Sequence, residues 1–155
     1  MTSGPLAPII LDAVDIAESI GSMGTTVLAS GCFDPLHVGH IEYLEAAKRT
    51  GETLLVAVYD DASVAKLKGE GRPVLSVDDR SQLVASIGVV DGVLIVTDTD
   101  LSDVLSIVRP AVVVVGGDGE AGNEGRVTVG RSRNSSSSDV IRRIKQAARG
   151  EAENS

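Results

Sequence analysis

Two histidines three residues apart are the only histidines in this chain of 155 residues. His37 and His40 lie in the segment Gly31–His40, which reads GCFDPLHVGH and follows a short β-rich run, Thr26–Ser30. Gly39 between them removes a side chain at a point where a ligand would approach the backbone. Imidazole N–H groups can hold phosphate oxygens and stabilise the charge that grows on phosphorus during transfer. The pattern therefore predicts phosphate chemistry at this segment.

A strand, a loop and a helix must position these histidines. Apolar residues at helical spacing after the loop, including Val38, Ile41 and Leu44, predict a helix as far as Thr50 and Gly51. The amino terminus of that helix would offer N–H groups and a partial positive charge to an anion. The near-continuous apolar run at 53–59 (TLLVAVY) then predicts a strand buried on both faces of a parallel sheet.

The remainder of the chain continues this alternation of strands and helices. Further strands are expected over Gly92–Val96, Ala111–Val115 and Arg126–Val129. Helices are expected over about 8–21, over Ala62–Leu67, from a cap at Asp78 or Asp79 to about Gly88, from a cap at Ser102 to before Pro110, and over Asp139–Ala148. We therefore predict an α/β, Rossmann-like fold, an open, mostly parallel five-stranded sheet with helices on both faces, whose ligands bind beyond the carboxyl ends of the strands.

Charge and composition exclude several classes of protein. The chain has 14 Lys and Arg against 22 Asp and Glu, a net charge of -8, and its aromatic residues are two Tyr and one Phe. It therefore lacks the basic surface and the stacking platforms with which proteins bind nucleic acids. The single cysteine, Cys32, excludes an internal disulfide and a cysteine-rich zinc site, and the lack of a third imidazole disfavours a zinc site at the histidine pair. We expect Cys32 to be a small packing residue in a protein of the reducing cytoplasm.

The chain is expected to be one domain over residues 1–150, followed by a frayed tail at 151–155. Its apolar amino-terminal stretch, Leu6–Leu11, has no basic region before it and is followed by Asp12 and Asp15. We therefore expect neither a signal peptide nor a membrane partner.

Two further patterns have more than one interpretation. The segment Gly117–Gly122 fits G-x-G-x-x-G, but a strand-like run follows it instead of a helix, which disfavours a dinucleotide site. Lys66, Lys68 and Arg72 form a basic cluster that is equally typical of solvated surface charges and of anion binding.

Several segments together resemble the cytidylyltransferase-like family of the HxGH nucleotidyltransferase superfamily. The segment GCFDPLHVGH is similar to its G-x-F-D-x-x-H-x-G-H pattern, and Leu67–Val74 (LKGEGRPV) to the L-K-G-x-x-R-P-V of the ADP-heptose synthase branch. Arg80 matches an Arg early in a helix, and Val90–Val93 resembles V-D-x-V. Arg131–Ser138 aligns with the R-T-E-G-I-S-T-T of glycerol-3-phosphate cytidylyltransferase. The motifs follow the family's order over roughly 27–144.

The resemblance implies transfer of a nucleoside monophosphate from a nucleoside triphosphate to a small phosphorylated metabolite, with release of pyrophosphate. Because the acceptor phosphate is itself the nucleophile, catalysis rests on alignment and charge neutralisation. Mg²⁺ is implied as a companion of the nucleotide, with no metal site of the protein itself. The resemblance is also compatible with a homodimer.

The same resemblance implies roles for individual residues. The implied catalytic residues are His37, His40, Lys68 and Arg131, and Asp34, Lys68 and Arg80 are implied to bind the substrate. The residues implied to bind the nucleotide are Gly31, Cys32, Phe33, His37, Gly39, His40, Gly117, Asp118, Arg131, Ser136, Ser137 and Ser138.

The sequence departs from the family's pattern after the fourth expected strand. Residues 115–119 read VGGDG where the heptose branch has K-G-G-D-Y, and the segment 119–125 is shorter than in that branch. The first expectation is adenylyl transfer to a sugar 1-phosphate that resembles heptose 1-phosphate. One alternative is cytidylyl transfer to glycerol 3-phosphate or another small phosphate or phosphonate. Another is a homologue that binds nucleotide without turnover.

Overall fold

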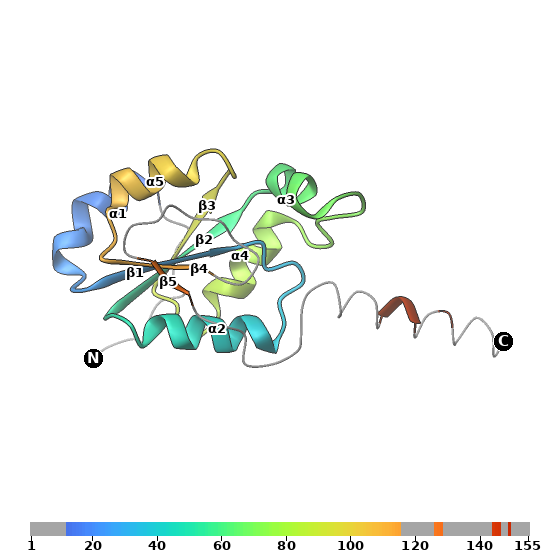
Figure 1. Cartoon of the computed structure of the whole chain (residues 1–155), viewed down its shortest axis with the longest axis horizontal. Helices are drawn as coiled ribbons and strands as arrows, with labels where there is room; N and C mark the ends of the chain where they lie inside the picture. Colours follow the sequence, from blue (N-terminus) through green and yellow to red (C-terminus); the bar gives the residue numbers. More distant parts are fainter. Residues whose placement is uncertain (1–11, 116–125, 129–143, 147–148, 150–155) are drawn as a thin grey trace.

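The computed structural model describes residues 12–115, 126–128, 144–146 and 149. These residues form a five-stranded sheet in the order β3-β2-β1-β4-β5, in which all four neighbouring pairs are parallel (Figure 1). The strands are β1 (Thr26–Gly31), β2 (Thr53–Tyr59), β3 (Gly92–Val96), β4 (Val112–Val115) and β5 (Arg126–Thr128). The predicted α/β class and open parallel sheet are confirmed.

Helices cover both faces of this sheet, as predicted. They are α1 (Ala13–Ser19) with the short 3-10 turn η1 (Ile20–Ser22), α2 (Val38–Lys48), α3 (Asp61–Lys68), α4 (Val77–Ala85) and α5 (Leu101–Val108). The core residues of α2 and α4 pack with one set of strand side chains, and those of α1, α3 and α5 with the other. In Figure 1, α1 and α5 lie above the sheet and α2 lies below it. Burial on both faces explains why β2 is apolar throughout.

The starts of two helices differ from the prediction because other residues cap them. Ser76, not Asp78 or Asp79, precedes α4, and its hydroxyl accepts a hydrogen bond from the Asp79 N–H at 3.2 Å. The two aspartates instead lie in the first turn, where their charges favour the helix dipole. The helix α5 begins at Leu101, one residue before the predicted cap Ser102, because the preceding turn closes through Thr97 and Asp100.

The bounds of three other predicted helix ends can be compared with the structure. Asp12 caps α1 through a 2.7 Å hydrogen bond from the Val14 N–H, so the first helix begins later than expected, and 1–11 lie outside the described residues. The helix α4 ends at Ala85 instead of Gly88. Within the predicted last helix, 144–146 are helical, and its other residues lie outside the described part of the chain; residue 149, just beyond the predicted end, is helical too.

The order of the strands places a switch point between β1 and β4, because the chain moves to one side of β1 for β2 and β3 and to the other side for β4. Tyr43 of α2 reaches this point. Its buried hydroxyl donates toward the carbonyl oxygens of Val114 at 3.0 Å and Ser30 at 3.3 Å. The helix that carries both histidines is thereby held to the carboxyl ends of β1 and β4.

The V-D-x-V segment lies at the opposite, amino-terminal edge of the sheet. The Asp91 carboxylate accepts hydrogen bonds from the Leu54 N–H at 2.8 Å and from Lys48 Nζ at 2.5 Å. Lys48 also donates to the Glu52 carbonyl at 2.6 Å. Asp91 therefore joins the start of β2 to the end of α2, a structural role remote from the histidines.

Replacing Asp91 with Ala is expected to lower the free energy of unfolding by about 1–3 kcal/mol, because the Leu54 N–H loses its acceptor. Urea unfolding measures this change. The exposed Glu45→Ala, on the outside of α2, is the control and should change stability by less than about 0.5 kcal/mol. Nucleotide affinity should be unchanged in both variants, and a weaker affinity in Asp91→Ala at unchanged stability would contradict this assignment.

Candidate active site

The loop between β1 and α2 is shaped by an aromatic side chain that lies beneath it. Phe33 adopts a positive φ of 51° and its ring is buried. A Cβ at Gly31 would lie 3.0 Å from that ring, so glycine is needed there for close packing. The Phe33 ring in turn lies 5.1 Å from the His40 ring, between centroids. Gly31 and Phe33, two of the residues predicted to bind nucleotide at this loop, therefore pack together beside the His40 ring.

His37 and His40 cap the helix that they begin. His37 is the N-cap of α2, and its Nδ1 accepts a hydrogen bond from the Gly39 N–H at 3.1 Å. The His40 Nδ1 accepts one from the His37 N–H at 3.2 Å. The rings stack with their centroids 3.9 Å apart and an interplanar angle of 28°. The spacing of three residues is that of a capping box, in which the side chains of two residues accept hydrogen bonds from backbone N–H groups at the start of the helix.

This capping fixes which nitrogen of each ring carries the proton. A nitrogen that accepts a hydrogen bond has no proton, so in the neutral ring the proton is on Nε2. Both rings then present an Nε2–H donor, the form that can bind an anionic oxygen. The first-turn N–H groups of Gly39, His40 and Ile41 are already hydrogen bonded within the turn. An anion at this helix start would therefore meet imidazole donors, and a contribution from backbone N–H groups stays a prediction.

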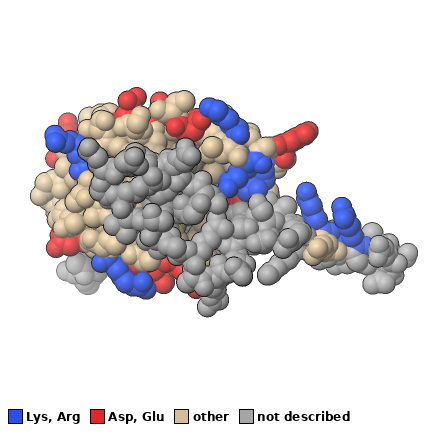
Figure 2. All heavy atoms as spheres, viewed as in Figure 1, with Lys and Arg blue, Asp and Glu red and all other residues tan. Residues whose placement is uncertain are grey.

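The basic cluster after β2 separates into residues with different partners. Lys66 forms an ion pair with Asp98 at 2.7 Å on the outside of α3, and Arg72 forms one with Asp34 at 2.9 Å. Lys68, at the end of α3, lies near the Cys32 thiol. Figure 2 shows basic side chains gathered around the end of α3, on a surface where acidic and basic groups otherwise mix.

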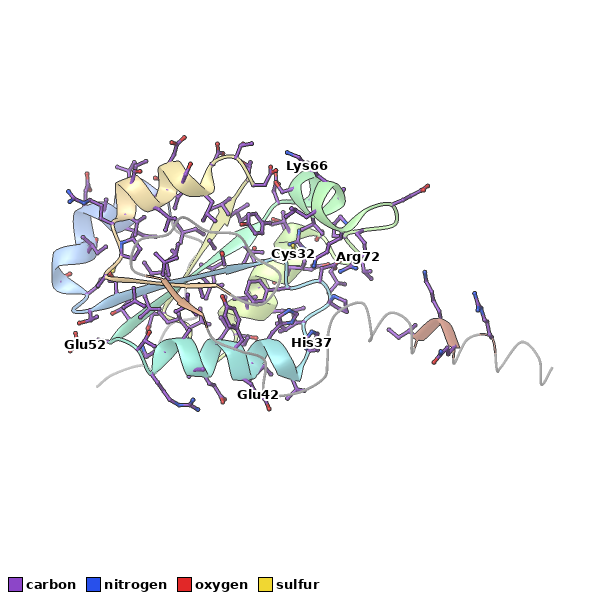
Figure 3. The ribbon with its side chains drawn as sticks, viewed as in Figure 1. Cys32, His37, Glu42, Glu52, Lys66 and Arg72 are labelled. Atoms are coloured by element: carbon purple, nitrogen blue, oxygen red, sulfur yellow. The ribbon has the colours of Figure 1, made fainter. Side chains whose placement is uncertain are left out.

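Cys32 packs against the apolar cluster of β2 and α5, as expected of a small packing residue. Burial raises the pKa of its thiol, and the nearby positive charges of Lys68, Arg80 and Arg72 oppose that rise without reversing it. The thiol is therefore protonated at neutral pH and unsuited to act as a nucleophile. In Figure 3, Cys32, Arg72 and His37 lie at one end of the sheet and Glu52 lies at the other.

Asp34 holds the loop from inside instead of facing solvent. Its side chain is 0 % exposed and accepts hydrogen bonds from Arg72 Nε at 2.9 Å, the Val74 N–H at 2.7 Å and the Leu75 N–H at 2.8 Å. Burial disfavours the charged carboxylate, but these hydrogen bonds and the Arg72 charge outweigh it and hold the pKa of Asp34 below its usual range. The described geometry gives Asp34 a positioning role, and its contact with a substrate stays a prediction.

Arg80 is likewise inside the protein, although the resemblance implied that it binds substrate. Its side chain is 0 % exposed and donates to the carbonyl oxygens of Cys32 at 2.8 Å, Tyr59 at 2.7 Å and Leu75 at 2.9 Å. Its Nη2 also pairs with the Asp61 carboxylate at 2.7 Å. These partners occupy the guanidinium from several sides, so the role that the structure shows is to join the carboxyl ends of β1 and β2.

The remaining predicted site residues lie outside the described part of the chain, and their roles stay predictions. They are Gly117, Asp118, Arg131, Ser136, Ser137 and Ser138. The strand β4 ends at Val115, which pairs with Ser30 of β1, so the carboxyl end of β4 lies beside that of β1. The sequence analysis did not predict the role of Tyr43 or the ion pair of Arg72. A tyrosine on an apolar helix face and an arginine in a basic loop do not indicate by themselves which residues they will contact.

An open parallel sheet with paired histidines at its carboxyl edge, next to the switch point, is the arrangement that the resemblance to the nucleotidyltransferases implied. The sequence pattern of the cytidylyltransferase-like family matches residues 28–143, and the chain belongs to this family. Among the described residues, no helix is long and apolar enough to cross a membrane, and no group of three or more His, Cys, Asp or Glu side chains is placed to hold a metal ion.

The chain is similar to several curated and solved proteins. It is 41% identical over 137 residues to the bifunctional protein HldE of Pseudomonas fluorescens Pf-5, an alignment that covers 81% of this chain and 28% of that protein. Against HldE of Pseudomonas putida F1 it is 51% identical over 92 residues, 59% of this chain and 20% of that protein. The chain thus spans less than a third of these relatives. A lipopolysaccharide core biosynthesis protein from Thermoplasma volcanium is a structural neighbour with a TM-score of 0.61 and 26% identity, covering 72% of this chain and 99% of that one.

The lowered pKa of Asp34 predicts a particular dependence of stability on pH. Its contribution is complete above its unfolded-state pKa, at about pH 4, and is lost as the pH falls through the lower folded-state pKa. The difference in unfolding free energy between the wild type and Asp34→Asn should therefore shrink as the pH falls from about 5 to 2. Urea unfolding at a series of pH values measures it, with the exposed Asp103→Asn as control. A difference that stays constant over this range would refute the role of the buried carboxylate.

Proposed function

We propose that this domain transfers the adenylyl group of ATP to a sugar 1-phosphate similar to heptose 1-phosphate, with release of pyrophosphate. The observation that carries the proposal is the stacked pair of His37 and His40, whose Nδ1 atoms each accept a hydrogen bond, beside the switch point of a cytidylyltransferase-like domain. The LKGEGRPV segment, similar to the heptose branch, and a structural neighbour named for lipopolysaccharide core biosynthesis support a sugar phosphate as acceptor.

In the proposed reaction, an oxygen of the acceptor phosphate attacks the α-phosphorus of the nucleotide, and the bond from that phosphorus to the bridging oxygen of pyrophosphate breaks. The histidine Nε2–H groups donate to the phosphate oxygens on which negative charge grows. Lys68 binds phosphate oxygens, and Arg131 with the serines at 136–138 holds the leaving pyrophosphate. No residue has to remove a proton from the acceptor, because a phosphate oxygen is already ionised at neutral pH.

Mg²⁺ fits this site as a companion of the nucleotide and not as a resident of the protein. Asp34 lies three residues before His37, and its oxygens already accept hydrogen bonds from Arg72 and from two backbone N–H groups. When bound to the phosphates, the ion would neutralise charge on the triphosphate. A homodimer and a cytoplasmic location remain predictions.

The first test is a panel of nucleotides and acceptors, with pyrophosphate release as the measurement. We expect release with ATP and a heptose or related sugar 1-phosphate, and release that depends on both substrates. Release with CTP and glycerol 3-phosphate would favour the alternative suggested by the likeness of Arg131–Ser138 to the glycerol branch. Nucleotide binding without release in any combination would show instead a binding protein that lacks turnover.

Replacing either histidine with Ala is expected to lower kcat by about 100 to 1,000-fold, since each change removes one donor to the transition state. His37→Ala also removes the helix cap, which lowers stability by about 1 kcal/mol. His37→Ser is the matched control, because serine restores a cap but not the Nε2–H donor. Both variants at position 37 should be equally slow, although only one is destabilised. Activity in His37→Ser close to that of the wild type would mean that the ring acts only as a cap.

A further inference from the structure

The candidate site is built from two parts of the chain. The loop between β1 and α2 brings the histidines, and the carboxyl end of α3, with the segment that follows it, brings Lys68. Asp34 belongs to the first part, three residues before His37, and Arg72 belongs to the second, four residues after Lys68. The ion pair between Asp34 and Arg72 therefore connects the two parts across 38 positions of sequence.

This connection holds the histidine loop by both its side chain and its backbone. Arg72 Nε donates to the Asp34 carboxylate at 2.9 Å, and Arg72 Nη2 donates to the Asp34 carbonyl oxygen. The N–H groups of Val74 and Leu75 complete the contacts of the same carboxylate. With 0 % of Asp34 and 11 % of the Arg72 side chain exposed, water competes little for these hydrogen bonds.

The residues between Lys68 and Arg72 pack little against the rest of the protein, so they do little to hold this loop in place. Gly69 and Gly71 have positive φ values of 98° and 81°, and a Cβ at either position would meet no atom within 4 Å. Residues 69–71 are exposed. At the other end, α3 is anchored by buried Val64 and by the pairing of Lys66 with Asp98. The helix therefore holds Lys68 on the β2 side, and the pair at Arg72 ties the loop that follows it to the histidine loop.

We propose that the Asp34–Arg72 ion pair sets the position of Lys68 relative to His37 and His40, so that Arg72 is a positioning residue that acts through Lys68. The inference rests on the proposed function, since it assigns Lys68 and the histidines to one phosphate site. Burial of an ion pair costs desolvation free energy. The proposal gives a reason for this cost, because the pair orders the two loops next to the histidines and Lys68.

A double-mutant cycle on kcat tests the inference, with Arg72→Ala, Lys68→Ala and the double variant measured at saturating substrates. We expect Arg72→Ala to lower kcat by about 100-fold in the wild-type background, the effect of a small misplacement of an aligned group. In the Lys68→Ala background the same change should alter kcat by no more than about 2-fold. Equal losses in both backgrounds would overturn the inference, since they indicate a direct substrate contact or a general loss of structure. Arg49→Ala, which removes an exposed arginine at the end of α2, is the control and should keep the wild-type kcat.

Removal of Arg72 leaves a buried carboxylate without its cation, so folding must be controlled. Arg72→Lys keeps the positive charge but cannot form the two parallel contacts of a guanidinium, and it should lower kcat in the same Lys68-dependent way. Activities are normalised to the folded fraction measured by circular dichroism. If the wild type releases no pyrophosphate with any substrate pair, the proposed function fails, and the same cycle is measured on the Kd of ATP. Additive changes in that Kd would then overturn the inference independently.

Discussion

The carboxyl ends of the central strands depend on one buried guanidinium. Arg80 extends from α4, on one face of the sheet. It donates to the carbonyl oxygen of Cys32, just after β1, and to that of Tyr59, at the end of β2. Its guanidinium also pairs with Asp61 of α3. Carbonyl groups at the end of a parallel sheet have no strand partners, so a donor must be supplied. Arg80 supplies several donors from one rigid group. Tyr43 performs the same task between β1 and β4 with its hydroxyl.

Two buried charges near one loop would destabilise the fold unless each is compensated. Arg80 is compensated by three carbonyl oxygens and a carboxylate, and Asp34 by Arg72 and two N–H groups. The two networks meet at Leu75, whose carbonyl accepts from Arg80 and whose N–H donates to Asp34. A reaction that needs no general base depends on the placement of donors around the phosphates. The networks restrain the loop that leads to His37 and His40, because the Asp34 carboxylate and the Cys32 carbonyl are each held by hydrogen bonds from a distant arginine.

The elements that were predicted well are those with a local signal. The apolar runs of β2 and β3 matched their observed bounds, and the loop with its helix start followed the strand as expected. The helix caps at Ser76 and Asp100 were misplaced, because several polar residues in succession can each begin a helix and packing selects one. Arg80 and Asp34 were predicted to bind substrate because each is a charged residue within a family motif. Such a motif position is equally compatible with a residue that contacts the ligand and with one that holds the loop in place.

The sequence by itself determined the class of fold and the chemistry of the site. Hydrophobic periodicity predicted a parallel sheet, and paired histidines at a glycine-containing helix start predicted phosphate binding. Only the tertiary structure decided which charged residues are buried and hold the loops, since that depends on contacts between residues far apart in the chain. The assignment of the proton to each Nε2 also needed the folded helix, because the N–H group that donates to each Nδ1 is in place only once the helix has formed.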